Sequence, residues 1–184
     1  MVAIVKTLTL EEFLELPETK PASEFINGEV IQKPMPQGEH STLQGELCNH
    51  INQVTKSAKI AYAFPELRCS FGSNVIVPDV AVFRWHRIPR QPSGRIANRF
   101  NLQPDWAIEI LSPDQSHAKL LAKLLFCSEQ GTELGWLIDP AEASVLVVLT
   151  DQRVQILSGN ASLPILQGIP LSLTVDQVFN WLSL

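Results

Sequence analysis

Two acidic residues interrupt stretches of sequence that are otherwise apolar. Glu109 lies in the segment Asp105–Leu111, DWAIEIL, and Asp79 follows Pro78 in the segment 76–82. A carboxylate that is buried without a partner is strongly destabilising, so each of these needs a metal ion, a lysine or hydrogen bonds. Carboxylate oxygens are ligands that Mg²⁺ prefers. The pair is compatible with a shared divalent ion, with a lysine or with hydrogen bonds, and a purely structural buried glutamate is the alternative for Glu109.

A second Pro-Asp pair, Pro104-Asp105, supplies a rival carboxylate. In an extended strand the Cα atoms of Asp105 and Glu109 are roughly 13 Å apart. That separation is too large for a shared ion whose ligands lie at about 2.1 Å. Asp79 belongs to a different extended segment and can lie beside Glu109. We therefore expect Asp79 to be the partner of Glu109 and Asp105 to begin the strand.

A lysine stands within reach of this pair on the helix expected to follow. Leucines at positions 120, 121, 124 and 125 form a core-facing stripe at helical spacing. Lys123 lies near the margin of that stripe and Lys119 lies farther round the helix. Lys123 can extend along the sheet to a site at a strand end. The alternative is an ordinary surface lysine.

Basic residues are concentrated in one part of an acidic chain. Fourteen Lys and Arg against 19 Asp and Glu give a net charge of −5, which argues against a general nucleic-acid coat protein. The segment from Val80 to Pro104 contains no acid, and it can contact a phosphate backbone locally. The alternative is a solvated loop whose arginines pair with acids elsewhere. The arginines of this strip are Arg84, Arg87, Arg90, Arg95 and Arg99.

The elements that must position these residues alternate between helices and strands. Helices are expected over 10–16, 38–56, 116–130 and 175–182, and a hairpin is expected around Asn27-Gly28. Further extended segments are expected over 61–71, 74–84, 105–111, 134–138, 144–149 and 153–157. This pattern predicts an α/β or α+β fold with a mixed sheet, in a single domain over 1–184.

Composition narrows the class of protein. Apolar residues make up 45% of the 184 residues, which excludes a disordered chain. No apolar run approaches the length of a membrane span, and the first ten residues do not have the pattern of a secretory signal. The three cysteines form no CxxC pair, so we expect a reducing cytoplasm and no zinc ribbon. Phosphate-binding glycine loops and HExxH spacing are also absent from the sequence.

Several short motifs, taken in order, resemble a known family. They are Leu10-Glu11-Glu12-Phe13-Leu14, Glu24-Phe25-Ile26-Asn27-Gly28-Glu29, Pro78-Asp79, Ile108-Glu109-Ile110-Leu111-Ser112-Pro113, Lys123, Gly131 and Trp136-Leu137-Ile138-Asp139-Pro140. Together they resemble the putative restriction endonuclease family common in cyanobacteria, formerly a domain of unknown function, within the PD-(D/E)XK nuclease-like superfamily. The resemblance covers nearly the whole chain.

The resemblance implies a restriction-endonuclease-like mixed central sheet flanked by helices, with additional hairpins. It implies that Asp79 and Glu109 hold Mg²⁺ or Mn²⁺, together with the Ile110 carbonyl. The superfamily lysine normally stands two residues after the glutamate, where this chain has Leu111, and Lys123 matches the family's displaced lysine. Glu24 and His40 match further family positions, as an additional ligand or polar partner and as a residue at the start of the long helix.

These observations predict a cytoplasmic, Mg²⁺-dependent endonuclease that hydrolyses DNA phosphodiester bonds. The alternatives are a weak or inactive nuclease fold that binds nucleic acid or a protein, and a structural module in which the buried acids pair with arginines. A homodimer is expected because duplex cleavage by this superfamily commonly uses two active sites. No membrane partner is expected.

Overall fold

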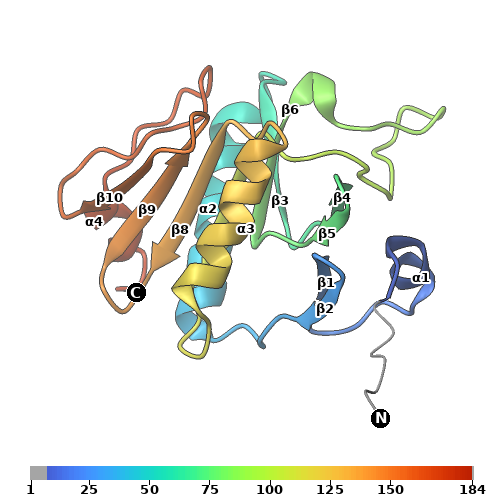
Figure 1. The fold of residues 1–184 in the computed structure, drawn as a ribbon. Helices are drawn as coiled ribbons and strands as arrows, with labels where there is room; N and C mark the ends of the chain where they lie inside the picture. The colour runs from blue at the N-terminus through green and yellow to red at the C-terminus, as the bar shows by residue number, and fades with distance from the viewer. Residues whose placement is uncertain (1–7, 184) are drawn as a thin grey trace, which may run out of the picture.

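The computed structural model describes residues 8–183, which are built around a six-stranded mixed sheet. Its strand order is β10-β9-β8-β7-β6-β3, and only β7 and β8 are parallel neighbours (Figure 1). Because a parallel pair needs a crossover, the chain between them forms helix α3. The strands are β3 (Ala61–Pro65), β6 (Val80–Arg84), β7 (Trp106–Ile110), β8 (Leu134–Asp139), β9 (Ser144–Leu149) and β10 (Val154–Ser158).

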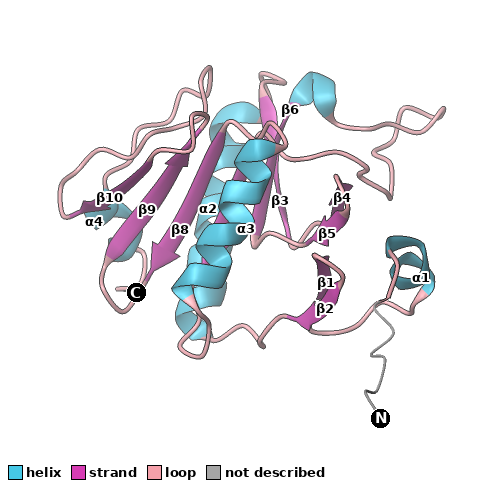
Figure 2. Ribbon diagram, viewed as in Figure 1, coloured by secondary structure: helices cyan, strands magenta, loops and turns pink. Residues whose placement is uncertain are grey.

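Two long helices cover the two faces of this sheet (Figure 2). Helix α2 (Gly38–Thr55) buries Leu43, Leu47 and Ile51, which recur every four residues and pack against Trp106, Ile108 and Ile110. Helix α3 (His117–Glu129) packs its own apolar stripe against Ala107 and Leu137 on the other face. Alternate residues of β7 therefore face different helices, and Glu109 faces the α3 side.

A smaller four-stranded sheet, in the order β2-β1-β5-β4, lies beside the large sheet. Its hairpin turns at Asn27 and Gly28, whose positive φ values of 52° and 85° are those of the two-residue turn expected from Asn-Gly. The strands are β1 (Ser23–Ile26), β2 (Glu29–Gln32), β4 (Cys69–Phe71) and β5 (Asn74–Ile76).

Short helices complete the described part of the chain. Both α1 (Leu10–Glu15) and α4 (Val175–Asn180) begin with a capping box, on Thr9 and Thr174. A 3₁₀ turn, η1 (Trp85–Arg87), follows β6. No helix within residues 8–183 is both long enough and apolar enough to cross a membrane.

The expected mixed sheet between helices is confirmed. The two extended segments 61–71 and 74–84 are each divided, however, so that β3 and β6 join the large sheet while β4 and β5 join the small one. The second division falls at Val77-Pro78-Asp79, because proline cannot donate a ladder hydrogen bond. Asp79 therefore lies at the junction of the two sheets.

Candidate active site

Asp79 and Glu109 lie together at one end of the large sheet. Asp79 directly precedes β6, Glu109 lies near the end of β7, and the antiparallel register pairs Val80 with Ile108. Both acids are 1% exposed. Sequence reasoning placed these two residues side by side, and the strand register accounts for that position.

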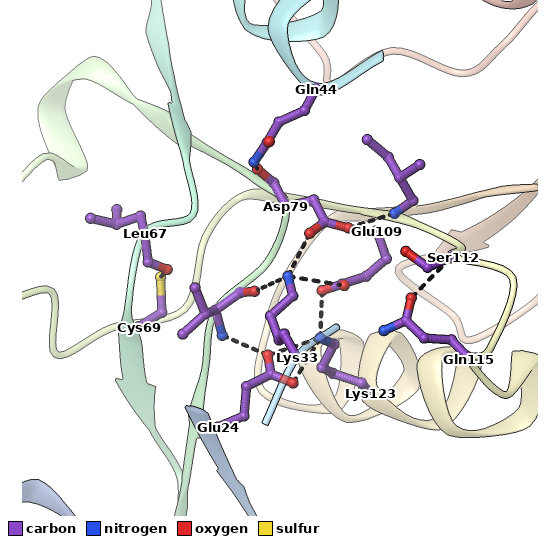
Figure 3. A network of polar contacts seen from close by, with 12 residues as sticks. Glu24, Lys33, Gln44, Leu67, Cys69, Asp79, Glu109, Ser112, Gln115 and Lys123 are labelled. Carbon is purple, nitrogen blue, oxygen red and sulfur yellow. Dashed lines mark hydrogen bonds and ion pairs between the residues drawn. The ribbon is translucent and has the colours of Figure 1, made fainter. Parts of the chain in front are cut away.

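Cations and donors surround the Asp79 carboxylate (Figure 3). The Ile110 backbone N–H donates to Asp79 Oδ2 at 2.7 Å, and His40 Nε2 lies 3.2 Å from the same oxygen. Lys33 Nζ lies 2.5 Å from Asp79 Oδ1. Burial raises the pKa of Asp79, but Lys33 and His40 outweigh burial and hold that pKa well below its usual range. Asp79 is therefore a carboxylate at neutral pH.

Lys33 is a site residue that the sequence reasoning missed. Its ammonium donates to the Val77 carbonyl at 2.7 Å and lies 3.9 Å from Glu109 Oε2, so it stands between the two carboxylates. A signal was available in the hairpin register. Glu24 pairs with Ile31, and Lys33 is two residues beyond Ile31, so Glu24 and Lys33 share one face of the small sheet.

Lys123 reaches the site from helix α3 and is itself buried. Its ammonium lies 2.9 Å from Glu24 Oε1 and 2.8 Å from Glu109 Oε1. Burial lowers the pKa of Lys123, but the carboxylates of Glu109 and Glu24 outweigh burial and raise that pKa. The side chain is thus a fixed positive charge and not a mobile surface lysine.

Glu24 is one of the buried acids of this cluster, at 4% exposed. Its Oε1 accepts a hydrogen bond of 2.7 Å from the Val77 backbone N–H, which ties β1 to the junction before Asp79. Glu24 and Glu109 therefore both contact the Lys123 ammonium, and together they hold it in place (Figure 3).

Glu109 is the least satisfied member of the cluster. Its two oxygens are buried and held by ion pairs with Lys123 and Lys33, with no hydrogen bond of normal geometry. Burial raises the pKa of Glu109, and Lys123 and Lys33 offset part of that rise, so that the resulting pKa is about 7. A carboxylate in this state has unused capacity for a ligand.

The cluster offers two neighbouring carboxylates, those of Asp79 and Glu109, to a divalent metal ion. Among residues 8–183, no group of three or more His, Cys, Asp or Glu side chains is arranged to hold a metal. The donors are the oxygens of Asp79 and Glu109, which suit Mg²⁺, although both Glu109 oxygens already face ammonium groups. The space between the two carboxylates holds the Lys33 ammonium. A divalent ion at this position would be held by Asp79 and Glu109 and would have to take the place of Lys33.

Helix α2 contributes two polar side chains from the opposite face of the sheet. His40 is 7% exposed and contacts Asp79, and Gln44, which sequence reasoning did not single out, donates through Nε2 to the Asp79 carbonyl at 2.8 Å. Leu111, at the usual position of the superfamily lysine, is half-buried beyond the end of β7. Ile110 contacts Asp79 through its amide, and ligation by its carbonyl stays a prediction.

Arg84 is the last residue of β6, and the other four arginines of the strip follow it, at the end of β6 opposite Asp79. Arg84 pairs with Glu133 at 2.8 Å, and Arg87 pairs with Asp105 at 2.6 Å, so these two already have acidic partners. Arg90, Arg95 and Arg99 are exposed. Arg90 stacks over Trp85, with 5.4 Å from its Cζ to the ring centroid. Phosphate binding by the strip stays a prediction, and only its exposed members have guanidinium groups available for it.

Two cavities flank the carboxylate cluster. The first, of about 620 Å³, is lined by Glu24, Lys33 and Lys123. The second, of about 600 Å³, is lined by His40 and Ser112, and Gln115 borders both. Asp79 and Glu109 line neither cavity and adjoin the two cavities through Lys33, Lys123 and His40, and each cavity is large enough to admit part of a substrate.

Comparison with known proteins identifies relatives of the whole chain. Residues 10–177 match the Uma2 family, described as "Putative restriction endonuclease". A crystal structure from Anabaena variabilis ATCC 29413, described as a "putative nuclease belonging to DUF820", is 51% identical to the chain. The match covers 95% of this chain and 99% of the Anabaena chain, with a TM-score of 0.93. No curated protein matches the chain significantly.

The family match spans most of the chain and includes the strands, the hairpin and the helix that bring Glu24, Asp79, Glu109 and Lys123 together. This chain therefore belongs to the Uma2 family of putative restriction endonucleases.

Proposed function

We propose that this protein hydrolyses phosphodiester bonds of DNA in a Mg²⁺-dependent reaction at the carboxylate cluster. The observation that supports this function is the meeting of Asp79, Glu109 and Lys123 from separate elements in one buried cluster between two cavities. Membership of the Uma2 family supports the same reaction class. Mn²⁺ is expected to replace Mg²⁺ because both accept oxygen ligands.

Each residue of the cluster has a role in this proposal. Asp79 and Glu109 hold the metal, and the Ile110 N–H and His40 fix the orientation of the Asp79 carboxylate. The chemistry that Mg²⁺ would supply at these carboxylates is polarisation of a phosphate oxygen and a lowered pKa for a bound water molecule. Lys123 neutralises negative charge that develops on the phosphate, and Glu24 keeps it in place.

The decisive experiment combines substrates with metals. Plasmid, linear duplex and single-stranded DNA are each incubated with Mg²⁺, Mn²⁺ or a chelator. We expect cleavage with either metal and none with the chelator. The matched variant is Asp79→Asn, which keeps an oxygen for the Ile110 N–H but removes the charge that attracts the metal. Cleavage that persists in Asp79→Asn would exclude this cluster as the active site.

A second candidate function is a nucleic-acid-binding or protein-binding module with little catalysis. Two features favour it: the Lys33 ammonium already neutralises the carboxylate pair, and Leu111 replaces the usual lysine. Under this alternative, DNA binding is unaffected by metal, and calorimetry detects no Mg²⁺ binding at millimolar concentration. Saturable Mg²⁺ binding that disappears in Asp79→Asn favours the nuclease.

A homodimer is the expected assembly if the enzyme cuts both strands, because each strand then meets its own site. Sedimentation of the protein with and without a duplex tests this assembly. A monomer that nicks plasmid DNA on one strand would retain the proposed chemistry and remove the dimer from the proposal.

A further inference from the structure

The cavity lined by His40 and Ser112 lies where three elements end close together. Helices α2 and α3 both begin at it, and strand β8 ends at it with Asp139. Figure 1 shows the starts of both helices at the same end of the large sheet. Ligands of open α/β sheets commonly bind at such an edge, beyond the carboxyl ends of parallel strands.

Both helices present uncapped amino-terminal turns there. The cap residues Gln37 and Ser116 make no side-chain hydrogen bond to their helices. The first turns of an α-helix leave N–H groups without intrahelical partners, and the helix dipole places partial positive charge on them. Helices α2 and α3 have 18 and 13 residues, long enough for this polarity to develop. Two such ends at one cavity favour an anion.

Two buried side chains of the same lining supply independent evidence for a missing ligand. His40 is 7% exposed and Ser112 is 5% exposed. Neither His40 Nδ1 nor Ser112 Oγ has a hydrogen-bond partner in the structure. Buried polar atoms in folded proteins are nearly always paired, so these two indicate a polar group that binds beside them.

The carboxylates that line the cavity should repel a bound anion only weakly. Asp139 is already satisfied: His117 Nε2 lies 2.9 Å from its Oδ2, and its Oδ1 accepts from the N–H groups of Ala141 and Glu142. Glu39 and Glu142 are exposed, and water screens their charge. The helix ends and the unpartnered buried atoms are the groups that a ligand would meet inside.

We propose that this cavity binds a phosphate group of the nucleic-acid strand, next to the phosphate that is cleaved. The identification of the ligand as part of a nucleic-acid strand rests on the proposed nuclease function. The identification of a phosphate rests on the cavity alone. His40 borders the cavity and also contacts Asp79, so the subsite adjoins the carboxylate cluster. The N–H groups that begin α2 and α3, with Ser112 Oγ, hold the phosphate oxygens.

The test is a titration of metal-free protein with inorganic phosphate, followed by amide NMR. We expect saturable shifts at Gly38, Glu39, His117 and Ala118. Gln37→Asp places a capping carboxylate on the same N–H groups of α2 and stabilises the helix, so lost binding cannot be attributed to unfolding. We expect it to weaken phosphate binding at least fivefold, and the control Gln37→Ala to keep it. Ser112→Ala should weaken it without altering the fold.

The outcomes separate this subsite from the proposed function. Phosphate shifts that are absent, or equal in Gln37→Asp and Gln37→Ala, overturn the subsite even if the protein cleaves DNA. Phosphate binding that behaves as expected supports the subsite even if no cleavage is found. An oligonucleotide titration then identifies the source: weaker binding in Gln37→Asp supports a backbone phosphate, and unchanged binding overturns the assignment to the strand in favour of a free anion.

Discussion

Lys33 Nζ lies 2.5 Å from Asp79 Oδ1, with the Val77 carbonyl as its second partner. Both side chains are almost fully buried. In a buried ion pair of this kind each charge compensates the other, and removal of one partner leaves the other charge buried without compensation. It also places an ammonium where the Asp79 and Glu109 carboxylates would share a metal. Metal binding and the Lys33–Asp79 pair therefore compete for the same oxygens.

Replacement of Lys33 by methionine tests this competition. In metal-free protein, Lys33→Met leaves Asp79 with only His40 and an amide as partners, and the free energy of unfolding should fall by about 3 kcal/mol. The same variant should bind Mg²⁺ at least tenfold more tightly, because no ammonium has to be displaced. Denaturant unfolding and calorimetry measure the two effects. Lys119→Met, on the exposed side of α3, is the matched control. Weaker Mg²⁺ binding in Lys33→Met would instead make Lys33 part of the metal-bound site.

Lys123 is predicted to act in cleavage beyond its structural role. Lys123→Met leaves Glu24 and Glu109 buried beside each other, so both stability and cleavage should decrease, the stability by about 3 kcal/mol. The double variant Lys123→Met/Glu24→Gln removes the excess charge and should recover much of the stability. We expect its cleavage rate at saturating Mg²⁺ to remain at least a hundredfold below that of the unmodified protein.

Two comparisons complete the Lys123 experiment. Lys119→Ala should change the rate little, and equal losses at positions 119 and 123 would reduce the helix to a general source of positive potential. Leu111→Lys restores the usual superfamily spacing, and we expect it to recover some activity in the Lys123→Ala background. A double variant that regains both stability and rate would show that Lys123 only balances Glu24.

The parts of this site that sequence predicts are those governed by local pattern. The alternation in β7 places Glu109 on the α3 face, and the leucine stripe of α3 turns Lys123 toward the same face. The Asn27-Gly28 turn fixes the register of the hairpin. Each of these features follows from a short stretch of residues. The convergence of the acids with Lys123 could therefore be predicted from the sequence.

The rest depends on how separate elements dock. The hairpin register puts Lys33 on the same face as Glu24, but Lys33 enters the cluster only because the small sheet packs against the junction at Val77-Pro78-Asp79, and no local pattern encodes that packing. The two divided strands were missed for a related reason. The sequence pattern of a run of extended residues is the same whether its two halves pair within one sheet or belong to two different sheets. Gln44 similarly reaches the Asp79 carbonyl only through the packing of α2.

The pH dependence of stability should report on Glu109. Its pKa is raised from an ordinary value of 4.5 to about 7 in the folded protein, so the unfolded chain loses its proton first as the pH rises. The associated stability is fully present below about pH 4.5 and is lost as the pH rises through about 7. The loss should be on the order of 3 kcal/mol.

The measurement compares unfolding of metal-free wild-type protein with Glu109→Gln across this range. The variant has no proton to lose at position 109, so the difference between the two proteins isolates the glutamate. Asp79 adds no slope in this window, because its pKa is held far below it. A difference that stays constant from pH 4.5 to 8 would mean that Lys123 and Lys33 fully stabilise the charged form of Glu109.

The exposed arginines of the strip give the last prediction. Arg90, Arg95 and Arg99 make no ion pair in the described part of the chain, whereas Arg87 pairs with the buried Asp105. If each exposed arginine contacts one phosphate, each replacement by glutamine should reduce the salt slope of duplex binding by about 0.9. The triple variant should then bind DNA more weakly at low salt, with unchanged stability and unchanged Mg²⁺ affinity.

Arg87→Gln is the contrasting control: it leaves Asp105 with reduced compensation and should lower stability by about 2 kcal/mol, with the salt slope intact. Affinity measured at several salt concentrations, alongside sedimentation, distinguishes the roles. An unchanged slope with a shift toward smaller species would assign the three arginines to an interface between copies of the chain.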